Sequence, residues 1–421
     1  MKKILLANSG SLGDLHPFMG LALEFQKQGH KVLLVSSESY RPYVESYGID
    51  FASIRPDLHP EDPEIIAAVL DQRSGPRRLH KDYVFKYTRV AYEDLERLVE
   101  GYDIIVTGAL GFFVPTLAEV KRLPWVSVFL SPILLWSAFD PPVIPQSPIV
   151  TRFCRFLGPR FTKVFFDFIF AGANSWAGEL HRFRKELGLA RSKGLYRGMM
   201  DSPYLNVALF SKHFAPAQPD WPQPLLQPGF VGFDGGRSSE LDPELAKFLA
   251  SGAAPVLFTL GSTASERPGE LFKIFREAGE LISHRSLFVV GKKVAEELKH
   301  LNSDKTFFAA YVPYSSIMAR SKVIVHQGGV GTMAQAMKSA RPSLIVAQVN
   351  DQPDNGRHLA ETGAGDCLHA NGLTGATLAA KITWLASESS VEVAAKRLAA
   401  ELSLESAAAD TCAQILALLK P

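Results

Sequence analysis

The sequence predicts an α/β protein made of two Rossmann-like domains, each a doubly wound parallel sheet. Its 421 residues exceed one ordinary α/β domain, for which about 150–200 residues are usual. The chain opens at Ile4–Ser36 with strand, small-residue loop, helix and strand, an order that gives parallel strands joined by a crossover helix. After a Pro- and Gly-rich stretch at 215–236, the same order restarts at Val256–Leu260.

Short apolar runs mark the buried strands of the first half. A helix is expected to open at Pro17, because proline suits the first helical turn, and Gly29 is expected to stop it. The strands are predicted at Ile4–Ala7, Lys31–Ser36, Asp103–Thr107, Trp125–Phe129 and Tyr204–Phe210, with Tyr204–Phe210 as the last strand of this half.

The second half shares this architecture without repeating the sequence. Helices are expected around Leu271–Ser283 and Thr332–Ala340, between strands at Val256–Leu260, Leu287–Val290, Lys322–Val325 and Ser343–Val346. The chain is therefore divided into an N-terminal domain, an interdomain linker, a C-terminal domain and an Ala/Leu-rich helical tail. Their expected bounds are 1–213, 214–236, 237–390 and 391–421.

Composition limits the classes of protein to consider. The chain is 47% hydrophobic and 21% charged, with a formal net charge of +2, which is too balanced for a polyanionic partner such as nucleic acid. Its three cysteines are far apart and form no metal-binding pattern, which favours a reducing cytoplasm and predicts no metal site. No run of about 20 apolar residues is present, so no membrane span is predicted.

The richest motif is the turn His326–Thr332, which follows a predicted strand and leads into a predicted helix. Its glycines allow a ligand close to the backbone, and free N–H groups at a helix start suit a diphosphate. His326 is placed to donate to a phosphate oxygen. A tight structural turn is the alternative explanation, and the motif alone leaves it open.

Two further segments lie near this motif in the sequence. Asn350–Asn355 follows the next strand and carries acceptor groups that suit sugar hydroxyls, although a polar turn that caps a helix is the alternative. Phe307–Tyr314 offers aromatic side chains for stacking on a nucleobase, although ordinary core packing is the better explanation of Phe307.

The order of these three segments resembles the nucleotide-sugar signature of the UDP-glycosyltransferase superfamily, which has the GT-B fold. There an aromatic-x-Pro loop precedes a His-x-Gly-Gly-x-Gly-Thr turn and then an Asp-Gln pair. Gly10–Pro17 resembles the Gly-Asp-x-x-Pro loop of bacterial members, and Pro219–Pro222 and Thr259–Ser262 resemble the same subgroup. The subgroup is similar to the bacterial rhamnosyltransferases of rhamnolipid synthesis and to sterol-glucosyltransferase-like and antibiotic glycosyltransferases.

The resemblance implies two GT-B domains facing each other across a cleft, with the donor bound by the second. Tyr311 would stack on the base, His326 would hold the diphosphate, and Asp351 with Gln352 would bind the sugar. The full implied donor set is Gly13, Ser262, Thr263, Tyr311, Val312, His326, Gly328, Gly329, Gly331, Thr332, Asp351 and Gln352. Plant members have Gln where Tyr314 stands and Glu where Ala334 stands, so UDP and dTDP both remain open as the carrier nucleotide.

The general base is expected to be Asp14. Many family members use a histidine at this motif position, with a helper carboxylate after a later strand. Here Gly108–Phe113 follows that strand and contains no carboxylate, so His16 would act unassisted and is the lesser candidate. The alternative is that Asp14 only caps the helix near Pro17.

The acceptor is expected to bind the first domain. An apolar pocket is predicted from Phe112, Phe113, Leu135, Trp136 and Phe139. The segment Arg152–Ser175 interleaves basic residues with seven phenylalanines, which suits an anionic bilayer; an amphipathic helix with one packed and one solvated face is the alternative.

The predicted function is inverting, metal-independent transfer of a hexose from a UDP- or dTDP-sugar to a hydroxyl of a hydrophobic small molecule or lipid. The nucleotide sugar is a co-substrate, so no cofactor is expected. The expected location is cytoplasmic, with peripheral contact at the inner face of the membrane. The alternatives are an inactive nucleotide-sugar-binding partner and, less favoured because the GxGxxG spacing is missing, a nucleotide-dependent oxidoreductase.

Overall fold

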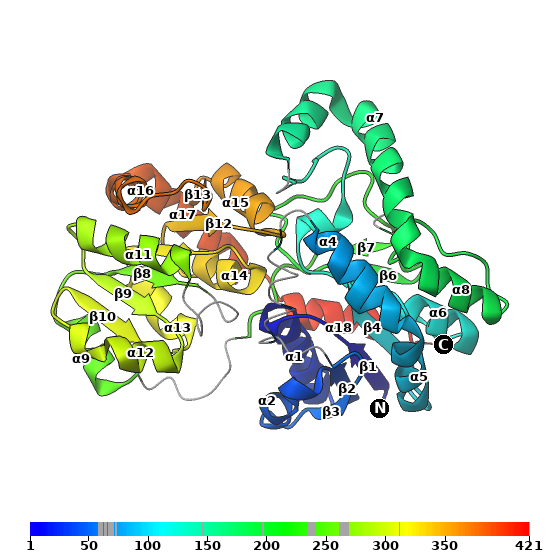
Figure 1. The fold of residues 1–421 in the computed structure, drawn as a ribbon. Helices are drawn as coiled ribbons and strands as arrows, with labels where there is room; N and C mark the ends of the chain where they lie inside the picture. The colour runs from blue at the N-terminus through cyan, green and yellow to red at the C-terminus, as the bar shows by residue number, and fades with distance from the viewer. Residues whose placement is uncertain are drawn as a thin grey trace. The chain divides into compact units, whose positions relative to one another are not determined.

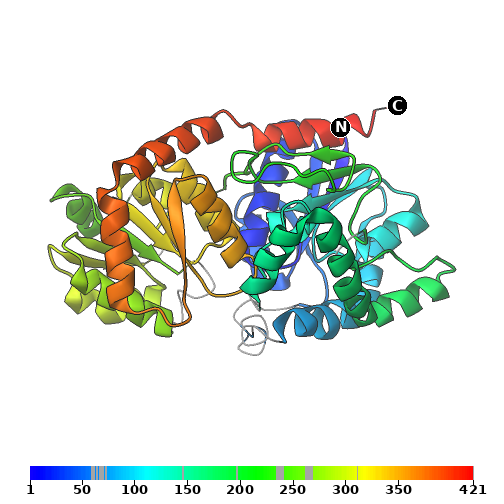
Figure 2. The same cartoon turned by 90° about the horizontal axis from the view of Figure 1, so that it is seen from above.

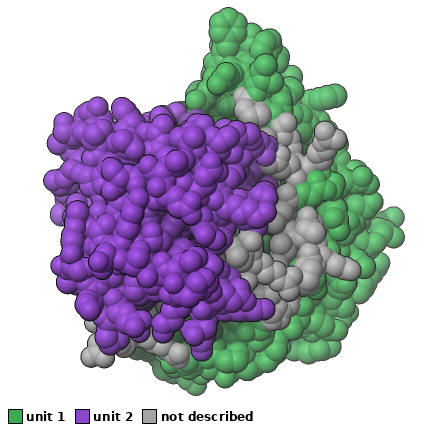
Figure 3. Space-filling model, turned by 60° about the vertical axis from the view of Figure 1, so that its left-hand side comes forward, with its two compact units in different colours: residues 1–231, 406–421 green, residues 232–405 purple. Residues whose placement is uncertain are grey.

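The computed structural model describes residues 1–57, 62, 65, 71, 74–144, 147–195, 198–233, 241–260, 269–310 and 312–420. It divides the chain into two compact units, coloured separately in Figure 3. Unit 1 comprises residues 1–231 together with 406–421, and unit 2 comprises residues 232–405. The last helix of the chain thus belongs to the first unit.

Unit 1 is built on a seven-stranded parallel sheet of order β3-β2-β1-β4-β5-β6-β7 (Figure 1). Residues of β1, β4, β5 and β6 are buried at successive positions, which requires both faces of the sheet to be covered. Its strands are β1 (Lys3–Ala7), β2 (Lys31–Ser36), β3 (Asp50–Ser53), β4 (Ile104–Gly108), β5 (Trp125–Phe129), β6 (Leu205–Ala208) and β7 (Leu225–Leu226). Its α-helices are α1 (Leu12–Lys27), α2 (Arg41–Glu45), α4 (Gly75–Arg78), α5 (Thr88–Leu98), α6 (Val114–Lys121), α7 (Pro148–Ala173), α8 (Gly178–Glu186) and α18 (Ala407–Ala417).

Unit 2 repeats the plan with a six-stranded parallel sheet of order β10-β9-β8-β11-β12-β13 (Figure 2). Alternate strand residues enter two core clusters, one with α11 and α16 and the other with α9 and α14, so helices cover both faces. Its strands are β8 (Val256–Thr259), β9 (Ser286–Val289), β10 (Thr306–Ala309), β11 (Val323–His326), β12 (Ser343–Ala347) and β13 (Gly365–His369). Its α-helices are α9 (Pro243–Ala250), α11 (Glu270–Leu281), α12 (Lys292–Leu298), α13 (Tyr314–Ile317), α14 (Val330–Lys338), α15 (Gln352–Glu361), α16 (Gly375–Ser387) and α17 (Ser389–Ser403).

Aromatic packing joins the first three strands of the second sheet. Phe258 stacks on Phe288 with ring centroids 4.7 Å apart, and Phe288 stacks on Phe308 at 5.0 Å. Phe307 points to the other face and packs on Phe248, so the core role expected for Phe307 is confirmed. Large aromatic side chains on both faces fix the register of the strands that end at the candidate site.

The first helix begins earlier than the sequence suggested. The expected start at Pro17 is wrong, because α1 begins at Leu12 with Ser11 as its N-cap and Pro17 inside the helix. Ser11 and Asp14 form a capping box, which satisfies N–H groups that the first turn leaves without partners. Asp14 therefore lies in the first turn of the helix and not ahead of it.

The segment expected as a linker is largely part of unit 1. Residues 214–231 pack there, with Phe214, Trp221 and Phe230 buried, and β7 adds a strand beside β6. The last strand of unit 1 is β7, so the expectation that Tyr204–Phe210 supplies it is wrong. The sequence did not predict β7 because two residues are too few to show a periodic pattern.

The helical tail consists of two helices in different units. Helix α17 lies in unit 2, whereas α18 packs against α1 of unit 1, where the Cys412 thiol lies 3.8 Å from the carbonyl oxygen of Leu21. Among the helices that the structure describes, none is both long and apolar enough to cross a bilayer.

Candidate active site

Each sheet has one point where the strand order reverses. In unit 1 this point lies between β1 and β4, and in unit 2 between β8 and β11. Open parallel sheets bind ligands outside the carboxyl ends of the strands at this point. Asp14 lies in the first turn of α1, just after the loop that follows β1, and the His326 turn follows β11, so the two strongest motifs lie at the two reversal points.

His326 ends β11 and is fully buried. Its Nδ1 accepts a hydrogen bond of 3.1 Å from the backbone N–H of Gly328, which places the ring proton on Nε2. That Nε2 has no hydrogen-bond partner among the described residues. Burial lowers the pKa of His326 to about 3, so at neutral pH it is a neutral donor and not a cation.

Gly328 must be glycine for two reasons. Its φ of +91° is a conformation that other residues rarely adopt, and a Cβ there would lie 2.7 Å from Cγ2 of Ile345. The amide of Asn355, also fully buried, donates to the Gly328 carbonyl at 2.9 Å and to Asp351 at 2.8 Å. The turn is therefore held by α15 as well as by its own backbone.

Helix α14 begins directly after this turn. Gly329 is its N-cap and has no side chain to satisfy the first N–H groups, those of Val330, Gly331 and Thr332. A Cβ added at Gly329 would meet nothing within 4 Å, so the backbone there borders open space. Together with His326 Nε2–H, these groups form a set of neutral donors suited to an anion.

Tyr314 joins β8, α13 and α14. Its hydroxyl lies 2.7 Å from Oγ1 of Thr259 at the end of β8, and it also bonds to the side chain of Thr332. Burial raises the pKa of the Tyr314 phenol, so the hydroxyl stays protonated. In the sequence, Tyr314 was notable only because plant members of the superfamily have Gln at this position. In the structure, its hydrogen bonds help to fix the start of α14.

Asp351 is the N-cap of α15, without a capping bond from its side chain, and Gln352 is the first residue of the helix. The side-chain Oε1 of Gln352 accepts hydrogen bonds from the backbone N–H groups of Gln348 and Val349 at 2.8 and 3.2 Å. The side-chain NH₂ of Gln352 is therefore the group that can bind a ligand. Asp351 accepts from Asn355 through Oδ2. Both residues therefore also hold the loop between β12 and α15.

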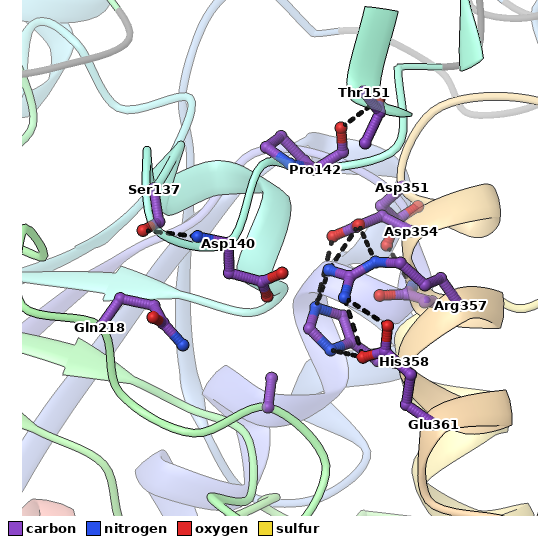
Figure 4. Close-up of polar contacts among 12 residues, drawn as sticks. Ser137, Asp140, Pro142, Thr151, Gln218, Asp351, Asp354, Arg357, His358 and Glu361 are labelled. Atoms are coloured by element: carbon purple, nitrogen blue, oxygen red, sulfur yellow. Dashed lines mark hydrogen bonds and ion pairs between the residues drawn. The ribbon is translucent and has the colours of Figure 1, made fainter. Parts of the chain in front are cut away.

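Helix α15 carries a charge cluster that the sequence analysis missed, with Asp354 and His358 buried and Glu361 exposed (Figure 4). Arg357 pairs with Asp354 at 3.1 Å and with Glu361 at 2.9 Å, and it donates to Nε2 of His358 at 2.7 Å. Because a guanidinium has no acceptor atom, His358 must be neutral at Nε2. The i, i+3 and i, i+4 spacing places these groups on adjacent turns, where they rigidify the helix that bears Asp351.

Three expected donor-site residues, Ser262, Thr263 and Tyr311, lie outside the described residues. Val312 is half-buried and packs against the core cluster that includes Phe307. Gly13 lies in the first turn of α1, where its N–H donates to Oγ of Ser11 at 3.2 Å. It belongs to unit 1, whereas the other described residues of the implied donor set belong to unit 2.

Asp14 is held by the residue that caps its helix. Its Oδ2 accepts from the backbone N–H of Ser11 at 2.8 Å and from the Ser11 hydroxyl at 2.9 Å. Burial raises the pKa of Asp14 above its ordinary 3.8, and the hydrogen bonds from Ser11 oppose the rise. A Cβ at Gly10 would lie 2.4 Å from Oδ2, so Gly10 gives the carboxylate its room.

His16 is directed elsewhere. Its Nε2 lies 3.0 Å from the hydroxyl of Tyr43 in α2. Residues two apart on a helix do not share a face, so His16 and Asp14 point in different directions. Asn8, at the end of β1, is a further polar residue at this reversal point: its buried Nδ2 has no partner in the described part of the chain.

Two of the expected acceptor residues, Phe112 and Trp136, pack in separate aromatic clusters. Phe112 packs with His80 and Phe85 at centroid distances of 5.8 and 5.1 Å, and Phe113 beside it is also buried. Trp136 packs edge-on against Phe166 and Phe170 of α7 at 5.4 and 4.9 Å.

The loop that follows Trp136 is fixed by the segment expected as a linker. Leu135 is buried, whereas Phe139 is 52% exposed. Asp220 accepts from the Ser137 hydroxyl at 2.6 Å and from the Ala138 N–H at 2.8 Å. Ser137 in turn accepts from the N–H of Asp140 at 3.2 Å (Figure 4). The Pro-Asp-Trp-Pro motif therefore serves to shape this loop.

Comparison with known proteins supports the interpretation of the fold. The model of the glycosyltransferase family 28 N-terminal domain matches residues 4–94, and that of the erythromycin biosynthesis protein CIII-like C-terminal domain matches residues 281–418. The chain is 29% identical to O-mycaminosyltylonolide 6-deoxyallosyltransferase of Streptomyces fradiae, over 98% of this chain and 96% of that protein. It is 24% identical to a sterol 3-beta-glucosyltransferase of Arabidopsis thaliana, over 86% of this chain and 57% of that protein.

Solved structures show the same fold. The calicheamicin glycosyltransferase matches with a TM-score of 0.75 and 16% identity, over 100% of this chain and 98% of that one. The spinosyn rhamnosyltransferase in complex with thymidine diphosphate matches with a TM-score of 0.69 and 19% identity, over 100% of both chains. The glycosyltransferase domain models in both halves and the glycosyltransferase relative contradict the oxidoreductase alternative. Glycosyltransferase domains are matched in both halves and a glycosyltransferase relative aligns over nearly its whole length, so the chain is a glycosyltransferase with the GT-B fold.

Proposed function

We propose that this enzyme is an inverting, metal-independent glycosyltransferase that moves a hexose from a UDP- or dTDP-sugar to a hydroxyl of a hydrophobic small-molecule or lipid acceptor. The observation that carries the proposal is the His326 turn. It presents a buried imidazole N–H with no partner among the described residues, beside uncapped N–H groups at the start of α14. A diphosphate supplies the oxygen acceptors that such donors lack.

In the proposed reaction these donors stabilise the leaving group. As the bond between the anomeric carbon and the diphosphate oxygen breaks, its electron pair moves to that oxygen. The N–H groups of Gly331 and Thr332 and Nε2–H of His326 would bind the developing charge. Because His326 is neutral, it acts as a hydrogen-bond donor throughout and needs no change of protonation.

The remaining donor contacts follow from the resemblance. Tyr311 would stack on the base, with the backbone of Val312 at the pyrimidine edge and Ser262 and Thr263 near the diphosphate. The Asp351 carboxylate and the Gln352 NH₂ would bind sugar hydroxyls. Asp351 is bonded to Asn355 of α15 and Gln352 to the backbone of the loop before it, which supports this assignment, because fixed partners lose little conformational entropy when a ligand binds.

Asp14 is proposed as the general base. Its carboxylate would take the proton of the acceptor hydroxyl while that oxygen forms a bond to the anomeric carbon, on the face opposite the diphosphate. A pKa raised by burial makes Asp14 a stronger base than an exposed carboxylate. Ser11 occupies Oδ2, so Oδ1 is the oxygen proposed to accept the proton.

The acceptor class is proposed from the relatives and from unit 1. The two relatives described above are named as transferases to O-mycaminosyltylonolide and to a sterol. Phe112, Phe113, Leu135, Trp136 and Phe139 supply apolar surface in unit 1 that suits such molecules. The thymidine diphosphate bound in the spinosyn rhamnosyltransferase supports dTDP as a carrier, and the superfamily resemblance keeps UDP beside it.

We further propose a cytoplasmic location, with peripheral contact between residues 152–175 and the inner face of the membrane. The support is the composition of this segment and its apolar exposure.

Titration calorimetry with UDP and dTDP, followed by an assay of nucleoside diphosphate release from the matching sugar donors, tests the proposal. His326→Ala is expected to weaken nucleotide binding by about 1.5–3 kcal/mol, the worth of a hydrogen bond to a charged group. His300→Ala, in an exposed turn of the same unit, serves as the matched control and is expected to bind normally. Unchanged affinity in His326→Ala would contradict the placement of the diphosphate, and binding without any transfer would favour the inactive partner protein.

A further inference from the structure

Helix α7 exposes an unusual number of large apolar side chains. Eight of the nineteen exposed large hydrophobic residues of the described chain lie on this one 26-residue helix. They are Ile149, Phe153, Phe156, Leu157, Phe161, Val164, Phe168 and Ile169. Scattered exposed hydrophobic residues are normal, but a concentration of this kind marks a surface that binds another apolar phase.

The helix is bent into a corner near its middle. Gly158, with φ 81° and ψ 176°, is not helical, and Pro159 follows it. The Thr162 hydroxyl lies 3.0 Å from both the Cys154 and the Gly158 carbonyl oxygens, which links the two arms. The bent helix extends away from the sheet of unit 1 (Figure 1). Phe156, just before the bend, is 85% exposed.

The charges on α7 are mostly positive. The helix holds Arg152, Arg155, Arg160 and Lys163 against a single acid, Asp167. Arg155 pairs with Asp140, and Lys163 pairs with Asp167. Arg152 and Arg160 are exposed and have no ion pair among the described residues. Exposed phenylalanines between unpaired arginines suit a surface that is apolar inside and anionic at its edge.

The opposite side of α7 is packed against the predicted acceptor region. Phe166 and Phe170 are buried and contact Trp136. The helix thus has one side that contacts Trp136 and one side exposed to solvent.

We infer that the bent helix α7 inserts into the interface of an anionic bilayer, with its phenylalanines among the acyl chains and Arg152 and Arg160 at the lipid phosphates. A second copy of the chain fits the exposed face of α7 less well than a bilayer does, because a symmetric dimer contact would bring two cationic faces together. A bilayer satisfies both the apolar and the cationic groups.

The placement of α7 in the bilayer suggests how the acceptor reaches the enzyme, and that suggestion rests on the proposed function. An acceptor dissolved in the bilayer would reach the Trp136 region along α7 without crossing water. The binding of the membrane itself depends on neither donor nor acceptor.

Vesicle flotation of the full chain, without substrates, tests the inference. Vesicles of phosphatidylcholine alone are compared with vesicles that also contain phosphatidylglycerol. We expect binding to the anionic vesicles, weakened about tenfold or more by Phe156→Glu, since full burial of one such side chain is worth a factor of about 10–100. Arg152→Gln and Arg160→Gln should each weaken it about fivefold.

Leu404→Glu is the matched control, because Leu404 is also 85% exposed but lies in unit 2; it should bind like the unaltered chain. Equal binding by Phe156→Glu, or no binding to anionic vesicles, would overturn the inference. So would a dimer in light scattering that Phe156→Glu dissociates, because the face would then belong to a second copy. Transfer to a water-soluble acceptor, measured in the same variants, should be unchanged, which separates failure of membrane binding from failure of the proposed chemistry.

Discussion

Replacing Asp14 with asparagine separates catalysis from helix capping. The structure assigns two tasks to this carboxylate: its Oδ2 accepts two hydrogen bonds from Ser11, and it is proposed to take the acceptor proton. An asparagine oxygen can still accept both bonds from Ser11. An amide cannot take a proton, so only the second task is lost.

The expected effect on stability is small. Two hydrogen bonds to a charged oxygen become bonds to a neutral one, a loss of about 1 kcal/mol each at most. The raised pKa shows that burial disfavours the ionised carboxylate, so removing the charge offsets part of this loss. The free energy of unfolding at neutral pH should therefore change by about 1 kcal/mol or less.

The expected effect on turnover is large. Loss of a positioned base costs about 10²–10⁴ in rate, or about 2.7–5.5 kcal/mol in the barrier. Nucleoside diphosphate release under saturating donor and acceptor measures kcat, and titration calorimetry should show normal nucleotide affinity, because the His326 turn lies in the other unit.

The pH dependence gives an independent check with a definite sign. Because the pKa of Asp14 is raised above 3.8 in the folded chain, its protonation stabilises the fold, and this contribution is lost as pH rises through the raised pKa. Turnover should change in the opposite direction and rise with pH as the base ionises. Asp14→Asn should abolish both dependences.

Two control variants, Ser11→Ala and His16→Ala, test whether the effect of Asp14→Asn is specific to the base. Ser11→Ala removes a bond that lowers the pKa of Asp14, so it should shift the turnover profile to higher pH without a large loss of maximal rate. His16→Ala should lose only the contact with Tyr43. Near-normal turnover in Asp14→Asn would refute the role of Asp14, and a severe loss in His16→Ala beside it would transfer the role to His16.

Four further outcomes are expected. Excess EDTA should leave transfer nearly intact, because N–H donors at α14 are proposed to bind the diphosphate; loss of activity restored by magnesium would contradict this. Gly328→Ala should lower Tm and nucleotide affinity, since its Cβ would overlap Ile345, whereas Gly329→Ala, with open space around it, should keep its Tm. His326 has a pKa of about 3 when folded and 6.5 when unfolded, so stability should fall as pH drops below 6.5, by about 1.4 kcal/mol per unit; urea titrations of His326→Gln should lack this dependence. Truncation after Glu405 removes the buried Cys412 and Ile415, so it should abolish turnover and lower the Tm of unit 1, while a normal Tm would show that α18 is dispensable.

The sequence predicted the fold because its signals were strong and local. Buried strands such as Lys31–Ser36 and Trp125–Phe129 were placed with their observed bounds, since each is a short apolar run between polar turns. Strands β3, β7, β10 and β13 were not assigned, and the expected helix start at Pro17 overlooked the capping box of Ser11. That signal was readable, because a serine followed three residues later by an acid marks a helix start.

The candidate site was predictable in its position but not in its chemistry. The motifs placed His326 at the end of a strand and Asp351 and Asp14 after strands; the structure has Asp351 at the N-cap of α15 and Asp14 in the first turn of α1. They did not show that His326 is neutral, since this follows from burial and from the N–H of Gly328. Likewise Asn355 and Tyr314, which hold the turn and the start of α14, act through contacts between elements that no single segment displays.

The return of α18 to the first unit affects when the protein can become active during synthesis. Residues 1–231 leave the ribosome before unit 2, yet the helix that packs against α1 is encoded after unit 2. Until residues 406–421 emerge, the apolar face of α1 that receives Cys412 stays uncovered, and a chaperone could bind it. Because α1 also carries Asp14, a chain whose translation stops before residues 406–421 lacks the helix that packs against the proposed base's own helix.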